Sequence, residues 1–242
     1  MPDGISWAAL SRAAEHHLRR LSARGRGRVR FGLLVPWANS AVEDELPRFL
    51  KADAGWHVAR LVPATRSTAL DDRFLDGLID AVPAAIGQLA RLDLSGIGLA
   101  CTSAGFHDAA RLRRRVRQTS ASVEVISAFD AICRSLRRLA ARSIMLVTPY
   151  TEVVTAREAQ ALCREGFEVV GSAALGRTDG FSEIDPGELV RARYALAGAA
   201  DVTVVSCTAL RTVEAIDRLE GDGVGTLSSN SCLAAALALG AR

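Results

Sequence analysis

Short runs of Leu, Ile and Val alternate with longer segments along most of this chain. In the longer segments, apolar residues recur at the three- and four-residue spacing of an amphipathic helix. From residue 29 onward each short run is followed by one such segment, which is typical of α/β units around a parallel sheet. The predicted strands are 29–35, 56–62, 95–100, 123–126, 142–148, 167–171, 202–206 and 224–227. The predicted helices are 40–52, 72–91, 107–119, 129–140, 151–165, 187–199, 209–220 and 230–240.

The chain contains an internal repeat, which is visible when its two halves are aligned. A strand that ends in V-P-W-A-N at residues 35–39 corresponds to one that ends in T-P-Y-T-E at 148–152. Further along, G-L-A-C-T at 98–102 corresponds to V-V-S-C-T at 204–208. Self-similarity of this kind predicts a duplicated α/β domain.

The repeat also indicates how the chain divides. We expect a first α/β domain over residues 29–128, completed by 221–242, and a second over 129–220. Residues 1–28 precede the first predicted strand and form an N-terminal extension. Within it, the segment from Trp7 to Leu21 is amphipathic, which predicts a helix that docks on a partner subunit or stays mobile.

Composition narrows the class of protein. The chain has 242 residues, of which 49% are hydrophobic and 24% charged, as in ordinary globular proteins. A chain of this size folds without disulfides or a structural metal, and its five cysteines never form C-x-x-C. The apolar part of its longest uncharged stretch, 223–241, is too short to cross a bilayer, and the first 28 residues lack the apolar core of a secretory signal. We therefore expect a cytoplasmic protein with reduced thiols, no metal and no membrane contact.

Nucleotides and nucleic acids are not indicated as ligands. Neither G-x-G-x-x-G nor G-x-x-x-x-G-K-[ST] follows any predicted strand, so no phosphate-bearing cofactor is implied. Five arginines crowd the helix predicted over 107–119, but no aromatic residues are interleaved with them. That pattern favours a solvated helix face over contact with nucleic acid.

Two cysteines are the strongest candidates for chemistry. Cys101 and Cys207 occupy matching positions in the repeat, each at a strand end and each followed by Thr, and packing alone gives no reason to repeat this pair. The positive end of the following helix is expected to lower the pKa of each thiol. Cys133, Cys163 and Cys232 lie within helical apolar patterns and are interpreted as packing residues.

The repeated motifs are expected to line one cleft, because ligands of parallel α/β sheets bind beyond the carboxyl ends of the strands. Two thiols across a cleft could transfer a proton between the faces of a carbon or attack an activated double bond. Either reaction builds negative charge beside a carboxylate, and helix starts offer N–H groups that bind anions. The same polar residues could equally be ordinary helix caps. The candidate binding residues are Pro36, Trp37, Thr102, Ser103, Thr208, Ser229 and Asn230.

The motifs V-P-W-A-N-S, A-C-T-S-A, V-T-P-Y-T-E, S-C-T-A-L-R and S-S-N together resemble a known superfamily. It is the aspartate/glutamate racemase superfamily, and within it the branch of maleate cis–trans isomerases and arylmalonate decarboxylases is the most similar. The resemblance covers about residues 29–240. It implies two pseudo-symmetric Rossmann-like domains with parallel sheets, a small carboxylate substrate in the cleft between them, and neither a metal nor an organic cofactor. Dimers are common in this family, so a homodimer or higher homo-oligomer is expected.

The resemblance also implies roles for individual residues. Cys101 matches the nucleophile that, in the isomerases, adds to the double bond of maleate and gives a succinyl-type intermediate in which the central bond rotates. Cys207 matches the second cysteine, which acts as a proton donor or a second thiolate. Asn39 and Tyr150 match residues that bind substrate carboxylates. Decarboxylase relatives have glycine in place of the first cysteine, so the pair favours isomerase or racemase chemistry.

Three features bear on the substrate and the reaction. The isomerases usually carry a further carboxylate-binding Asn in the segment 178–183, which here reads T-D-G-F-S-E. Trp37 places a bulky aromatic residue in a turn where a smaller one is expected, and His107 could approach the cleft or lie on the surface. The functions to be compared are an isomerase of a small dicarboxylic acid, a racemase or decarboxylase of the same superfamily, and a non-catalytic carboxylate-binding protein.

Overall fold

The computed structural model describes residues 5–23, 28–50, 54–64, 69–119 and 124–241. They form two four-stranded sheets, ordered β2-β1-β3-β4 and β6-β5-β7-β8. All neighbouring strands pair in parallel, and the two halves share one strand order, which confirms the predicted α/β fold with two parallel sheets. The first sheet contains β1 Val29–Pro36, β2 Ala54–Leu61, β3 Gly96–Leu99 and β4 Val125–Ser127. The second contains β5 Ser143–Thr148, β6 Glu168–Ala174, β7 Val202–Val205 and β8 Thr226–Ser228.

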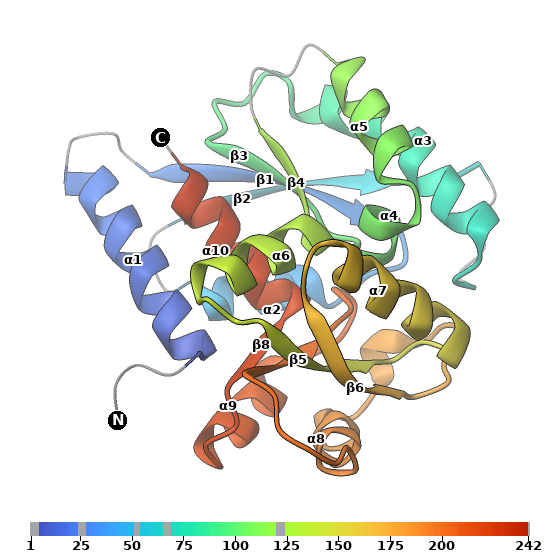
Figure 1. The fold of residues 1–242 in the computed structure, drawn as a ribbon. Helices are drawn as coiled ribbons and strands as arrows, with labels where there is room; N and C mark the ends of the chain where they lie inside the picture. Colours follow the sequence, from blue (N-terminus) through green and yellow to red (C-terminus); the bar gives the residue numbers. More distant parts are fainter. Residues whose placement is uncertain (1–4, 24–27, 51–53, 65–68, 120–123, 242) are drawn as a thin grey trace.

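Helices surround both sheets (Figure 1). In the first half, α3 packs against β2 and β1, and in the second half α7 packs against β6. The helices of the first half are α1 Trp7–Ala23, α2 Val42–Phe49, α3 Asp72–Leu89, α4 Thr102–His107 and α5 Ala109–Arg117. Those that follow are α6 Ala128–Arg138, α7 Glu152–Arg164, α8 Pro186–Tyr194, α9 Val213–Gly221 and α10 Ser229–Gly240, with a short 3-10 turn at Phe181–Glu183.

The prediction of a single helix over 107–119 was wrong in one respect. The chain already turns helical at Thr102, directly after Cys101, and the helix is interrupted at Asp108. The side chain of Asp108 accepts a hydrogen bond from the backbone N–H of Arg111, so it begins a new helix, α5. The consequence is that Cys101, and not a residue further along, stands at a helix start.

The last helix connects the two halves. The sequence had indicated that residues 221–242 complete the first half. β8 instead pairs with β7 in the second sheet, so only part of this segment joins the first half. α10 begins at the next residue and packs against α1, α2 and β3 of the first half and against α6, which directly follows β4. Glycine at position 98 of β3 allows this approach, because an added Cβ would lie only 3.1 Å from the side chains of Leu233 and Leu237. The domain boundaries between these elements otherwise stay a prediction.

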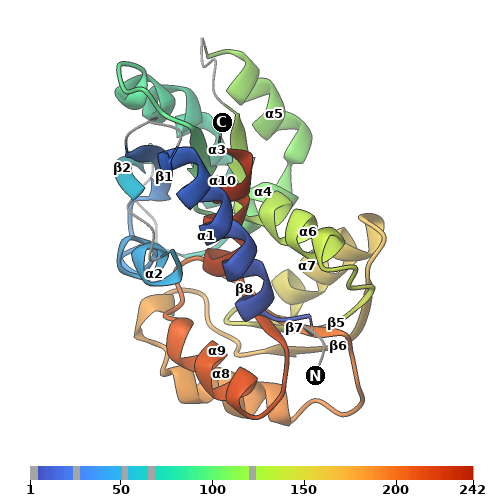
Figure 2. The same ribbon diagram turned by 90° about the vertical axis from the view of Figure 1, so that its left-hand side faces the viewer.

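The N-terminal helix is ordered against its own chain. Figure 2 shows α1 lying along α10, and its buried stripe consists of Leu10, Ala14, Leu18 and Leu21. The ring of Trp7 also meets Phe49 of α2 edge-on, with the centroids 5.0 Å apart. The amphipathic face is therefore covered within the monomer, and neither docking on a partner subunit nor mobility is needed to explain it. Within the described residues, no helix combines the length and the hydrophobicity that crossing a bilayer requires.

Candidate active site

A cavity of about 410 Å³ lies where the carboxyl ends of the two sheets meet. Pro36 ends β1, Cys101 follows β3, Tyr150 follows β5 and Cys207 follows β7, and all four line the cavity. The repeated motifs therefore converge at one place, as expected for parallel strands. The predicted site residues that line it are Pro36, Asn39, Cys101, Thr102, Ser103, Tyr150, Cys207 and Thr208.

Cys101 is buried at the N-cap of α4. The backbone N–H groups of Ser103 and Ala104 donate to its sulfur, which favours the thiolate as the sequence predicted. Burial acts in the opposite direction and is the larger effect, so the pKa of the Cys101 thiol is raised to about 11. The expected lowering of the pKa is therefore wrong for the ligand-free cavity. The N–H groups remain correctly placed to stabilise negative charge there.

Cys207 is held in an unusual backbone conformation. Its φ of 151° lies in a region that L-residues rarely adopt, and such strain costs about 1–3 kcal/mol. The backbone N–H of Cys207 donates to the hydroxyl of Ser229 at 3.0 Å, and the N–H of Ala209 reaches the sulfur at 3.4 Å. Burial raises the pKa of the Cys207 thiol to about 12, although a hydrogen bond from Tyr150 opposes this shift.

Tyr150 connects the two cysteine loops. Its hydroxyl accepts a hydrogen bond from Ser103 at 3.1 Å and also interacts with the sulfur of Cys207. Its ring packs edge-on against Phe181, with the centroids 5.6 Å apart. Because the side chain is only 1% exposed, burial raises the pKa of Tyr150 well above its usual value, and the phenol keeps its proton. A neutral hydroxyl is therefore available as a donor between the two thiols.

Asn39 links the turn after β1 to the second half. Its carbonyl oxygen accepts from the N–H groups of Ala41 and Val42, which fixes the orientation of the amide. Its NH₂ group donates to the hydroxyl of Thr208 at 3.1 Å, and that hydroxyl donates to the carbonyl of Ala100 at 2.7 Å. An amide nitrogen has two hydrogens, so one donor of Asn39 is left to point at a ligand.

Three of the predicted binding residues lie outside the cavity lining. Ser229 and Asn230 are fully buried, where Ser229 accepts from Thr102 at 2.8 Å and the NH₂ group of Asn230 donates to the Thr208 carbonyl at 3.2 Å. They therefore support the cysteine loops from behind. Trp37 packs on the apolar cluster of the first half, so its bulk does not narrow the cavity.

Several lining residues were missed by the sequence reasoning. Leu70 and Phe74 reach the cavity from the start of α3 and the residues before it, where no strand end marks them. Phe181 lines the cavity together with two exposed acidic residues, Asp179 and Glu183, in the segment that the resemblance had singled out. The lining contains neither Arg, Lys nor His among the residues that the structure describes. An anion would thus be held by N–H and O–H donors.

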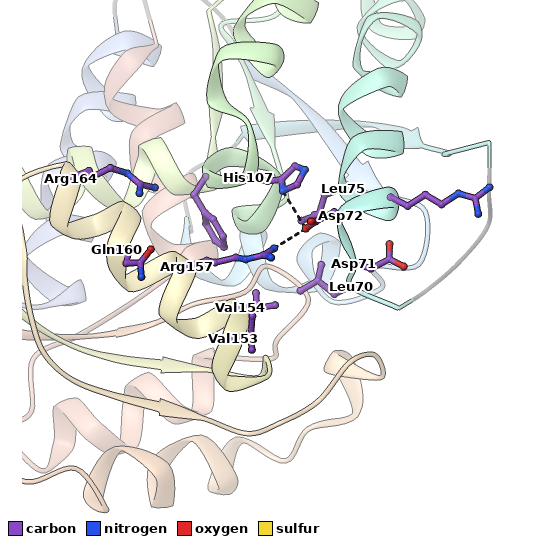
Figure 3. A pocket seen from close by; sticks show the side chains of 12 residues that line it. Leu70, Asp71, Asp72, Leu75, His107, Val153, Val154, Arg157, Gln160 and Arg164 are labelled. Atoms are coloured by element: carbon purple, nitrogen blue, oxygen red, sulfur yellow. Dashed lines mark hydrogen bonds and ion pairs between the residues drawn. The ribbon is translucent and has the colours of Figure 1, made fainter.

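A second, wider hollow of about 750 Å³ adjoins the first and shares Leu70 with it (Figure 3). Arg157 of α7 reaches across it to Asp72 of α3 at 2.7 Å. His107 lies on its wall, 3.1 Å from Asp76, and not in the cavity of the two cysteines. In the described part of the chain, no three His, Cys, Asp or Glu side chains are grouped so that they could hold a metal ion.

The fold and the site define a duplicated α/β protein with paired cysteines at one interdomain cavity. A family model described as arylmalonate decarboxylase matches residues 31–239, so the chain belongs to that family. A maleate isomerase from Alcaligenes faecalis is 25% identical over 216 residues, which are 81% of this chain and 83% of that protein.

Solved structures agree with this family. A Nocardia farcinica maleate cis–trans isomerase variant with a covalently bound succinylcysteine intermediate superposes with a TM-score of 0.77 at 22% identity, covering 86% of this chain and 90% of the other. Unliganded arylmalonate decarboxylase gives a TM-score of 0.69 at 27% identity, covering 87% and 92%. The predicted branch of maleate isomerases and arylmalonate decarboxylases is confirmed.

Proposed function

We propose that the protein is a cis–trans isomerase of a small unsaturated dicarboxylic acid such as maleate, with Cys101 as nucleophile and Cys207 as proton donor. The observation that carries this proposal is the placement of two repeat-related thiols in one cavity, beside Asn39 and Tyr150. The family match and the maleate isomerase relatives support it.

The reaction follows from this geometry. Cys101 loses its proton to solvent water, and the resulting thiolate adds to one carbon of the double bond and forms a C–S bond. The electron pair moves toward the neighbouring carboxylate, and the Cys207 thiol protonates the second carbon. The central bond, now single, rotates. The Cys207 thiolate then removes a proton from the second carbon, the double bond forms again in the trans geometry, and the C–S bond breaks.

Negative charge develops on the substrate carboxylate during addition, and the cavity meets it with donors. The N–H groups of Ser103 and Ala104, the remaining donor of Asn39 and the Tyr150 hydroxyl are fixed in place by their own contacts. Donors that are already oriented lower the barrier without reorganising during the reaction. They also replace the basic side chains that a dicarboxylate site would otherwise use.

Proton NMR in deuterated buffer tests the proposal. The protein would be mixed in turn with maleate, methyl-substituted maleates, aspartate, glutamate and an arylmalonate. Conversion of a cis-diacid to its trans isomer is the expected result. Deuterium at the α-carbon of recovered aspartate or glutamate, or of an arylacetate formed from the arylmalonate, would instead identify racemisation or decarboxylation. No change with any compound would favour the carboxylate-binding protein.

The acidic residues at the cavity are expected to weaken binding of a dianion. Neutralising both, in the variant Asp179→Asn/Glu183→Gln, should lower KM for maleate about two- to fivefold at low ionic strength and leave kcat unchanged. The effect should disappear in about 0.5 M salt, because exposed charges are screened. Initial-rate kinetics at two salt concentrations measure this, and Glu168→Gln, an exposed change outside the cavity, is the control. An unchanged KM at low salt would contradict it.

We also propose a homodimer or larger homo-oligomer and a cytoplasmic location. The resemblance to a family in which dimers are common supports the first. The free state of all five cysteines supports the second. Light scattering of the purified protein measures the mass in solution, and a monomer at micromolar concentration would contradict the first part.

A further inference from the structure

The mechanism above leaves one buried ionisable group unused. Glu158 of α7 is completely buried behind the cavity. One of its carboxyl oxygens, Oε1, accepts a hydrogen bond from the Ser206 hydroxyl at 2.5 Å. The other, Oε2, is buried and has no hydrogen-bond partner among the residues that the structure describes. Burial of a carboxyl group with an unpaired oxygen lowers the stability of the fold. Such a group beside Cys207 therefore indicates a role in the site.

Glu158 stands at the end of a directional chain of hydrogen bonds. The Cys207 N–H and the Thr102 hydroxyl both donate to the Ser229 hydroxyl, at 3.0 and 2.8 Å. The Ser229 and Ser206 hydroxyl oxygens are 3.4 Å apart, and Ser206 donates to Glu158. Each hydroxyl has a single hydrogen, so the bond to Glu158 leaves Ser206 free to accept from Ser229. The acceptor at Glu158 therefore orients the whole chain, up to the residues next to both thiols.

The chain ends at the strained part of the site. Cys207, with its φ of 151°, is the residue whose N–H the chain binds. Strain of this kind persists only where surrounding contacts fix the backbone. The chain supplies such a contact, and it also joins the cysteine loops of the two halves through Thr102 and Ser229.

We propose that Glu158 is a positioning residue for Cys207, which holds the Cys207 loop through Ser206 and Ser229 and, when ionised, keeps the Cys207 thiol in its protonated, proton-donating form. The role as proton donor rests on the proposed function. The effect of the Glu158 carboxylate on the Cys207 thiol does not depend on the proposed function, because this effect is a property of the ligand-free protein.

Electrostatics gives the direction of the effect. Burial raises the pKa of Glu158 to about 7, so the group changes its charge near neutral pH. The titratable groups that face it are Tyr150 and Cys207, and the Glu158 charge raises the pKa of both. Below pH 7 the carboxyl group is neutral and this influence is absent. Above pH 7 it is ionised and disfavours the Cys207 thiolate.

The decisive variant is Glu158→Gln, which keeps an oxygen acceptor for Ser206 but never carries a charge. Methyl methanethiosulfonate, a small neutral reagent, would be reacted with wild type and variant from pH 5.5 to 9, with modification of Cys207 quantified on its peptide by mass spectrometry. Thiolates are the reacting form, so the rate reports the thiolate fraction. The ratio of variant to wild-type rates should be close to one at pH 5.5 and rise to about three- to tenfold at pH 8.5, with a midpoint near 7.

Controls separate charge from packing. Modification of Cys101 in the same samples is an internal reference, and Glu152→Gln, an exposed change on the same helix, should give a ratio of one at every pH. A packing defect would change the Cys207 rate by the same factor at all pH values. A ratio that does not vary with pH, at whatever level, overturns the proposal.

A second variant keeps the test decisive if Glu158→Gln does not fold. In wild type, the logarithm of the Cys207 rate should rise with pH and show an inflection near 7, where Glu158 ionises. The Ser206 hydrogen bond lowers the pKa of Glu158, so Ser206→Ala should move this inflection to higher pH. A profile without an inflection in both proteins overturns the proposal. Neither measurement requires turnover, so a failure of the isomerase assay is distinguished from a failure of this inference.

Discussion

Replacing Cys101 with serine is expected to lower kcat/KM for maleate at least about a thousandfold, equivalent to roughly 4 kcal/mol of transition-state stabilisation. A serine hydroxyl is a much weaker nucleophile than a thiolate, and it stays protonated at neutral pH. The fold should be unaffected, because Cys101 is held by backbone N–H groups that also bind oxygen. Steady-state rates and a thermal melt measure the two effects.

The other cysteines provide the controls. Cys163→Ser, an exposed change outside the cavity, should retain wild-type rates. Cys207→Ser should accumulate a succinyl adduct on Cys101 after incubation with maleate. The serine hydroxyl can still donate a proton to the second carbon, but it lacks the thiolate that removes a proton when the product is released. Intact-mass spectrometry detects that adduct, and Cys101→Ser should show none. Turnover at the wild-type rate by Cys101→Ser would exclude the covalent mechanism.

The largest loss of stability is expected from Glu45→Ala. Glu45 of α2 is 1% exposed, and its carboxyl group accepts from the N–H and the hydroxyl of Thr212, at 2.8 and 2.7 Å. These bonds join the first half to the start of α9 in the second. Removal of the acceptor leaves the buried N–H of Thr212 unpaired, while its hydroxyl keeps Ser228 as an acceptor at 3.0 Å. The loss should lower the free energy of unfolding by about 3 kcal/mol. Urea denaturation followed by circular dichroism measures this change.

The neighbouring residue is a matched control. Asp44 also crosses to the second half, where it forms an ion pair with Arg211 at 3.2 Å, but both side chains are largely exposed. Asp44→Ala should therefore cost less than about 1 kcal/mol. Equal losses for the two variants would show that burial of the Glu45 contact is not what stabilises the junction between the halves.

The internal repeat made part of the candidate site predictable from the sequence. Cys101, Cys207 and Tyr150 were predictable because each follows a strand, and the carboxyl ends of parallel strands meet. Leu70 and Phe74 enter the same cavity from the beginning of a helix, and their position depends on how α3 packs, which no local pattern records.

Burial was the property that the sequence described least well. The position of Cys101 at a helix start correctly predicted N–H donors, but the extent of its burial reverses the shift in its pKa. Burial also explains Ser229 and Asn230, whose side chains look like ligands at a helix start and yet serve as internal supports. The burial of Glu158 was not predicted, because an isolated Glu in an amphipathic helix normally faces water.

The course of the last helix has a consequence for the history and the engineering of this protein. A gene duplication would first produce two separable copies, but here α10 leaves the second sheet and completes the first half. Neither copy on its own would retain all of its buried surface. A chimera between members of this family should therefore exchange residues 229–240 together with the first half and α6, and not with the rest of the second half, because the sequence of α10 must fit β3, α1 and α6.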